Sequence, residues 1–127
     1  RLIDCEIHSN LNAQSQVKLK VEINGREYER GGIGNGGYDA FIDALTQIMS
    51  GIGFTMPELV DYSVRIPKGG KPGALTECTI TWAGQPRNLR TRGVHANQVY
   101  AAVLATLRMV NTRLHGQAVG LESNLHQ

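Results

Sequence analysis

The chain has 127 residues, 13 basic and 11 acidic side chains, and a formal net charge of +2. This length suffices for one domain with a buried core, and the near balance of charge excludes an acidic tail or a polybasic arm. Glycine is enriched, with 15 residues. Five of them lie in one short stretch: Gly31, Gly32, Gly34, Gly36 and Gly37.

The two cysteines, Cys5 and Cys78, lie in alternating apolar segments, which indicates buried free thiols rather than a zinc site. No apolar run approaches the ~20 residues that span a bilayer, and no signal peptide is recognisable. The chain lacks an initiator methionine and opens on strand-like sequence. We therefore expect a domain of a longer cytoplasmic protein.

The first half predicts three strands and a helix. Strands are expected over residues 2–7, 16–23 and 27–33, with Asn24-Gly25 as the hairpin turn between the last two. Helical spacing of apolar residues predicts a helix over 38–49.

The second half repeats this order. Strands are expected over 59–66, 75–82 and 87–92, a loop over 68–73 and a helix over 96–111. Residues 114–127 lack periodicity and are expected to form a frayed tail.

The two halves align with each other. The offset is 57 in the first strand and 59 afterwards, which places Gly34 opposite Gly93 and Asp39 opposite Gln98, with two extra residues in the 68–73 loop. An internal repeat constrains the whole chain. We expect an α+β fold of two β-β-β-α repeats, residues 1–53 and 58–112, related by a pseudo-two-fold axis.

The second predicted helix is apolar nearly all round, since Arg108 is its only charge between Val99 and Val110. A surface helix normally has a polar face. Packing against the other repeat and a homodimer interface account for this equally well.

The glycine stretch matches G-x-G-x-x-G, but the strand before it belongs to a hairpin and Asp61 lies at the start of its strand, so a dinucleotide site is disfavoured. A glycine-rich turn into a helix also presents N–H groups to an anion. The structural alternative is a tight turn that needs positive φ.

Other chemistry is not indicated. The histidines show no metal spacing, Asp39 and Asp43 share a helix face without forming an acid–base pair, and no nucleophilic triad is evident. Arg90 and Arg92 have the same parity on a strand, where a small basic patch or an ordinary solvated face is expected, without the stripe typical of nucleic-acid binding.

Three segments together resemble the C-terminal regulatory domain of 2-isopropylmalate synthase and citramalate synthase. They are G-N-G-G-Y-D-A at 34–40, L-V-D-Y-S-V at 59–64, and Arg92-Gly93 with Ala96 before an alanine-rich helix. Gly37 departs from the proline common in that family. The likeness covers roughly residues 2–112.

The resemblance implies a homodimeric regulatory domain, residues 1–113, that binds leucine or isoleucine and gives feedback inhibition of a catalytic barrel absent from this chain. The chain alone is then not an enzyme and needs no cofactor or metal. Its partners are the effector amino acid, a second copy and the parent's catalytic domain, without nucleic acid or membrane.

A zwitterionic aliphatic amino acid needs donors for its carboxylate, an acceptor for its ammonium group and an apolar pocket. We expect the N–H groups near Gly34, Gly36 and Gly37 to supply the first and Asp39 the second. The remaining contacts, from strand parity and family position, are Tyr38, Leu59, Tyr62, Ile66, Thr76, Ala96 and Gln98. The competing interpretation is a ligand-free dimerisation module of the same kind of enzyme.

Overall fold

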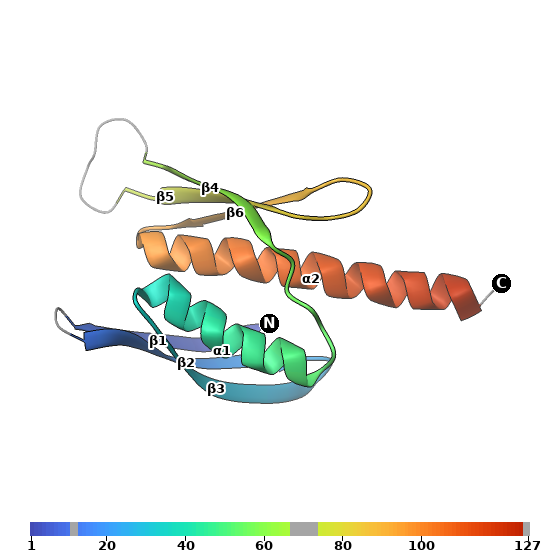
Figure 1. Cartoon of the computed structure of the whole chain (residues 1–127), viewed down its shortest axis with the longest axis horizontal. Coiled ribbons are helices and arrows are strands. Elements are labelled where there is room, and N and C mark those ends of the chain that lie inside the picture. Colours follow the sequence, from blue (N-terminus) through green and yellow to red (C-terminus); the bar gives the residue numbers. More distant parts are fainter. Residues whose placement is uncertain (11–12, 67–73, 126–127) are drawn as a thin grey trace. The chain divides into compact units, whose positions relative to one another are not determined.

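A computed structural model describes residues 1–10, 13–66 and 74–125 of the chain. It divides into two compact units, Arg1–Pro57 (unit 1) and Glu58–Gln127 (unit 2). Each unit has a three-stranded antiparallel sheet followed by a helix, so the expected α+β fold of two β-β-β-α repeats is confirmed (Figure 1). The elements are β1 (Leu2–Asn10), β2 (Ala13–Ile23), β3 (Arg26–Gly34), α1 (Gly37–Gly51), β4 (Leu59–Arg65), β5 (Thr76–Trp82), β6 (Leu89–His95) and α2 (Gln98–Leu125).

In unit 1 the alternation of β2 places Val17, Leu19 and Val21 in the core. The predicted hairpin turn is present, because Asn24 and Gly25 both have positive φ, 53° and 80°. Two consecutive residues of positive φ match the right-handed twist of the flanking strands. Helix α1 covers the β2 and β3 part of the sheet and contacts β1 much less.

Helix α1 buries one face and ends in a defined cap. After Gly51 the chain turns at Gly53, whose φ is 80°. The Gly53 N–H donates to the Ser50 carbonyl and the Phe54 N–H to the Met49 carbonyl, at 3.1 and 2.8 Å. This pair of bonds is the Schellman arrangement, which satisfies the last carbonyls of a helix. Phe54 is itself buried, so the cap adds to the core.

In unit 2 the equivalent face is formed by Cys78, Ile80 and Trp82 of β5. Thr91 of β6 joins this strand to the helix, since its hydroxyl accepts from Trp82 Nε1 at 2.9 Å and donates to the Ala105 carbonyl at 2.7 Å. Every polar group in this buried contact therefore has a partner, as burial requires.

Helix α2 differs from the expectation at both ends. It begins at Gln98 rather than 96 and continues to Leu125, so residues 114–125 are helical and the predicted frayed tail is corrected. The predicted loop at 68–73 and the last two residues lie outside the described part of the chain.

The offset between the repeats is also corrected. The first strands keep the offset of 57, since Cys5 pairs with Leu19 and Tyr62 with Ile80. From the second strand onward the offset is 61 rather than 59, because the pairs Val17–Gly32 and Cys78–Gly93 are equivalent. The buried helix positions repeat at the same offset. Four extra residues, not two, therefore separate the first two strands of unit 2.

Gly93 consequently corresponds to Gly32 and not to Gly34. A Cβ atom at Gly32 would lie 2.1 Å from the Ala40 carbonyl oxygen, and one at Gly93 would lie 2.1 Å from that of Ala101. Only glycine lets the third strand pass this close to the helix backbone. Both repeats therefore have the same close approach of the third strand to the helix.

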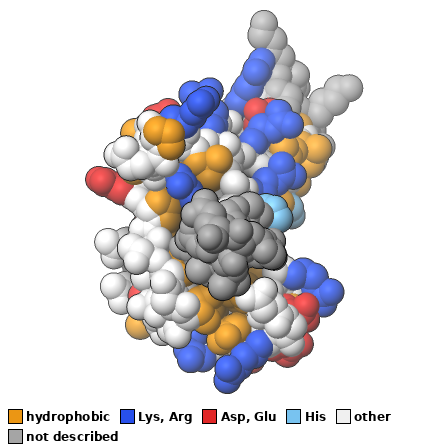
Figure 2. Space-filling view, turned by 90° about the vertical axis from the view of Figure 1, so that its right-hand side faces the viewer, with side chains coloured by type: hydrophobic (Ala, Val, Ile, Leu, Met, Phe, Trp, Pro, Cys, Tyr) orange, Lys and Arg blue, Asp and Glu red, His pale blue; other side chains and the backbone are white. Residues whose placement is uncertain are grey.

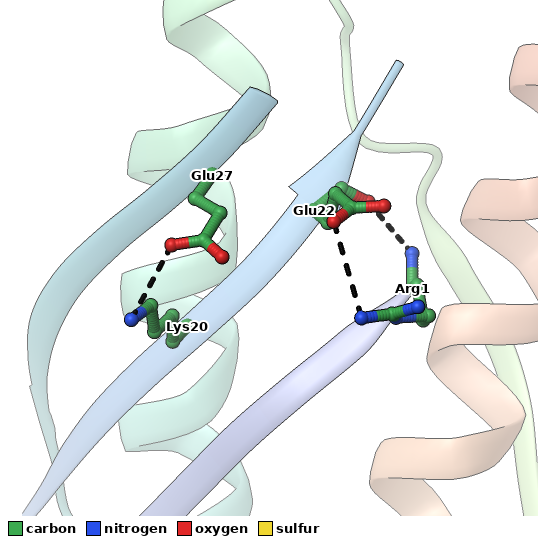
Figure 3. Close-up of polar contacts among 4 residues, drawn as sticks. All are labelled: Arg1, Lys20, Glu22 and Glu27. Atoms are coloured by element: carbon green, nitrogen blue, oxygen red, sulfur yellow. Dashed lines mark hydrogen bonds and ion pairs between the residues drawn. The ribbon is translucent and has the colours of Figure 1, made fainter. Parts of the chain in front are cut away.

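The outer surface of the first sheet carries cross-strand ion pairs. Lys20 Nζ lies 3.4 Å from Glu27 Oε2, and the Arg1 guanidinium lies 3.9 Å from Glu22 Oε2 (Figure 3). The amino group of Arg1 also donates a hydrogen bond to the Glu22 carbonyl at 2.7 Å. Exposed pairs of this kind contribute little to stability and serve mainly to keep this sheet face polar.

We predict that Gly32→Ala and Gly93→Ala each lower the free energy of unfolding by about 1–3 kcal/mol, since the added methyl group forces the strand away from the helix. Urea denaturation measures this effect. Gly51→Ala is the control, because a Cβ there meets nothing within 4 Å. That variant should equal or slightly exceed the native stability. Equal losses at all three positions would disprove the close-approach explanation.

Candidate functional site

The turn from β3 into α1 carries five of the expected site residues. Gly34 ends β3, Gly36 is the N-cap and Gly37 opens the helix. Gly36 has extended backbone, φ −132° and ψ 171°, and this N-cap residue makes no side-chain cap hydrogen bond. The first N–H groups of a helix have no partner within the helix, and they carry partial positive charge. This end of α1 therefore offers donors to an anion.

The equivalent end of α2 is closed by a side chain. Asn97 Oδ1 accepts from the N–H groups of Val99 and Tyr100 at 2.8 and 3.2 Å. His95 adds a further contact, because its Nδ1 accepts from the Asn97 N–H at 2.9 Å. Asparagine is among the strongest N-cap residues. The two repeats thus share a fold but differ at the N-cap, which is a glycine in α1 and an asparagine with a side-chain cap in α2.

The glycine stretch has a structural explanation at two positions. Gly32 and Gly34 lie against the backbone of α1, where a Cβ at Gly34 would come within 2.5 Å of the Ala40 nitrogen. The alternative of positive φ is wrong, since the positive-φ glycines of the described chain are Gly25 and Gly53. At Gly36 a Cβ would meet only Asp39 Oδ2, at 3.7 Å. Packing therefore does not require glycine at the N-cap.

Side chains of α1 tie the helix to β3 beside this turn. Asp43 Oδ2 accepts from the Ile33 N–H at 2.9 Å, and Gln47 Nε2 donates to the Gly31 carbonyl at 3.0 Å. Asp39, one turn earlier, is exposed in the first turn of the helix, and the half-buried Tyr38 ring lies 6.1 Å from that of Phe41. Asp43 has a structural role that its sequence pattern did not reveal.

In unit 2 the structure brings Tyr62 and Gln98 together. Burial raises the pKa of the Tyr62 hydroxyl, and a hydrogen bond with the Cys78 thiol raises it further, while a hydrogen bond with the Gln98 side chain lowers it. Thr76 is buried at the start of β5, on the same face as Cys78, and pairs with His95. These residues form one cluster where β4 and β5 meet the start of α2.

The other three expected residues of unit 2 lie at its surface. Leu59 is 39% exposed, Ile66 follows the end of β4 and is 65% exposed, and Ala96 lies exposed in the turn between β6 and α2. A register shift between Leu59 and Asp61 puts Leu59 on the same face as Tyr62 despite their different parity.

Strand β4 leaves more apolar surface exposed than the sequence indicated. Val60, which was not among the expected site residues, is 53% exposed beside Leu59 and Tyr62. Helix α2 packs mainly on β6 and β5, and its contact with this edge strand is at the Tyr62–Gln98 pair. Contiguous exposed apolar side chains are typical of interaction surfaces.

The structure defines an α+β domain of two repeats, each with a three-stranded antiparallel sheet followed by a helix. The family model described as LeuA allosteric (dimerisation) domain matches residues 1–114. The chain belongs to this family of allosteric and dimerisation domains of leucine-biosynthesis synthases. Within the described part of the chain, no helix is both long and apolar enough to cross a bilayer.

Cys78 is buried as expected, whereas Cys5 is only half-buried, and the surroundings of Cys5 generate a pH prediction. Burial, and then the charge of Asp4, raise the pKa of the Cys5 thiol to about 11 from an ordinary 9.0. The unfolded chain therefore loses this proton first, and the stability held below pH 9 declines as pH rises toward 11. At pH 8, Cys5 in a Cys78→Ala variant should react with a disulfide reagent about tenfold or more slowly when folded than when unfolded. Equal rates would contradict a shielded thiol.

Proposed function

We propose that this domain binds a branched-chain amino acid, leucine or isoleucine, and that binding produces feedback inhibition of a 2-isopropylmalate synthase-like acyltransferase. The observation that carries the proposal is the glycine N-cap of α1 beside a first-turn carboxylate. Gly36 leaves the helix N–H groups without a side-chain cap, and Asp39 follows three residues later. The carboxylate of an amino acid can accept hydrogen bonds from these N–H groups, and its ammonium group can pair with the Asp39 carboxylate.

Each unit has its own set of proposed effector contacts. The polar set lies in unit 1 and consists of Gly34, Gly36, Gly37 and Asp39, with Tyr38 beside it. The set in unit 2 provides apolar surface and a few hydrogen-bonding groups. It consists of Leu59, Tyr62, Ile66, Thr76, Ala96 and Gln98. An aliphatic side chain gains most of its binding free energy from apolar contacts of this kind.

The inhibition itself requires two arrangements of the parent enzyme that bind the effector with different affinity. Family membership supports an allosteric role for this domain. The proposal adds the effector's identity and the sign of its effect. We further propose that the parent enzyme works in the cytoplasm.

Calorimetry tests the site through Gly36→Asn. This substitution gives α1 the cap that Asn97 gives α2, and the available space and the extended φ both accept it. We expect a folded, slightly more stable protein whose affinity for leucine or isoleucine falls about tenfold or more, because the new side chain occupies the carboxylate's donors.

D-leucine and glutamate serve as ligand controls, and Asn97→Ala serves as the matched protein control. Asn97→Ala should lose about 1 kcal/mol of stability while keeping its effector affinity. Unchanged affinity in Gly36→Asn would exclude the α1 start as the carboxylate site. No binding of either amino acid by the native protein would favour the competing function, a ligand-free dimerisation module.

We also propose that two copies of the chain form a homodimer and that the apolar surface of β4 takes part. The exposed side chains of Leu59 and Val60 in β4, and of Ile66 directly after it, support this assignment. Sedimentation velocity at micromolar concentration should show a dimer, and Val60→Asp should raise the dissociation constant about tenfold or more, since it buries a charge. Lys18→Glu on the exposed face of β2 is the control. A monomeric native protein would refute the dimer, and an unaffected Val60→Asp dimer would refute the role of β4.

A further inference from the structure

A groove in unit 2 lies outside the proposed effector residues. Two adjoining hollows, of about 550 and 450 Å³, run along the edge strand β6 and the middle of α2 and share Leu89 and Thr112. Five arginines line them, and we call this surface the arginine groove: Arg87, Arg90, Arg92, Arg108 and Arg113. Figure 2 shows one face of the molecule, with Lys and Arg side chains in both the upper and the lower part of the view.

The positive charge of the groove is largely uncompensated. None of the residues lining the two hollows is acidic. Among the described residues, the ion pair recorded for these arginines joins Arg92 to Glu77 at 3.5 Å. Clustered charge of one sign in a hollow concentrates ions of the opposite sign.

Arg113 has donor capacity that the protein does not use. Its Nη2 donates to the Ala83 carbonyl at 3.2 Å, which holds the guanidinium against the β5–β6 hairpin. Its Nε is buried and has no hydrogen-bond partner among the described residues. A buried donor without an acceptor is unfavourable, so an arginine held in this way needs another reason to be there.

The first repeat shows that the fold does not need these arginines. At the offset of 61, Arg90, Arg92, Arg108 and Arg113 correspond in order to Glu29, Gly31, Gln47 and Ile52. Both units have the same strand order and the same helix packing. Only Arg87 has an arginine counterpart, Arg26. The other four therefore distinguish unit 2 by function rather than by folding.

We propose that the arginine groove binds a small molecule that carries phosphate groups, with a pyrophosphate group as the recognised chemistry. Planar guanidinium groups match phosphate oxygens in bidentate hydrogen bonds. The hollows fall within the range of about 300–1,000 Å³ typical of small-molecule sites. A zwitterionic amino acid has no net charge to match several cations, so this ligand is distinct from the proposed effector.

Isothermal titration with inorganic pyrophosphate and with ADP tests the proposal at about 50 mM salt, where screening is modest. The groove variant is the double substitution Arg90→Gln with Arg108→Gln. The matched control is Arg26→Gln with Arg30→Gln, which removes the same charge from the exposed hairpin of unit 1. We expect the native protein and the control to bind alike and the groove variant to bind about tenfold or more weakly.

Comparing the affinities for ADP and pyrophosphate shows whether the groove recognises the phosphate groups alone or also the organic part of the ligand. Tighter binding of ADP than of pyrophosphate would indicate that the organic part also contacts the groove, and equal binding would indicate recognition of phosphate alone. Sulfate at equal ionic strength should compete weakly. Equal competition by sulfate, equal losses in both double variants, or no heat from either ligand would overturn the proposal.

Two further measurements separate phosphate recognition from the binding of an acidic protein and from misfolding of the groove variant. Tighter binding of polyglutamate than of ADP would overturn the proposal in favour of an acidic protein partner. The groove variant is also titrated with leucine. Binding of leucine with the native affinity would show that the variant is folded and that the proposed effector site does not depend on the groove arginines. If circular dichroism shows that the groove variant is unfolded, Arg87→Gln replaces it, because Arg87 lies in the exposed hairpin loop. This single substitution should weaken pyrophosphate binding about threefold or more.

Discussion

The fold of each unit depends on the close approach of the third strand to its own helix. Gly32 lies on Ala40 and Ala44, and Gly93 lies on Ala101 and Ala105. With no side chain on the strand and only methyl groups on the helix, the two backbones come close enough to enclose the second strand's apolar face. Dispersion and burial then stabilise a small core, whose side chains would be partly hydrated if the packing were looser.

The sequence was sufficient for the order of the elements because each uses a local signal. Strict alternation marks β2, Asn24-Gly25 marks its hairpin, and 3.6-residue spacing marks α1. The repeat was recognised for the same reason. Its register was wrong by two residues because Gly34 and Gly93 were matched as turn glycines. Their actual roles depend on contacts with a helix, which no local pattern encodes.

The candidate site was less predictable than the fold. The α1 start was proposed as a site from the glycines and the helix dipole, and the structure adds that Asn97 caps the equivalent position in α2. In a regular strand Leu59 and Tyr62 would lie on different faces, whereas the register shift in β4 puts them on one. Arg90 and Arg92 are exposed, in keeping with the expected solvated face, while Arg108 and Arg113, which line the same two hollows, come from a helix that is distant in sequence.

The glycine–alanine contact also gives a characteristic spacing of residues that can be searched for in other sequences. In both units a glycine is followed by alanines eight and twelve residues later, and the two copies are 61 residues apart. In a related chain too divergent for alignment, two such triplets would mark a complete pair of units and set their register. A chain with a single triplet would contain half of the domain, and its second half would have to come from another polypeptide.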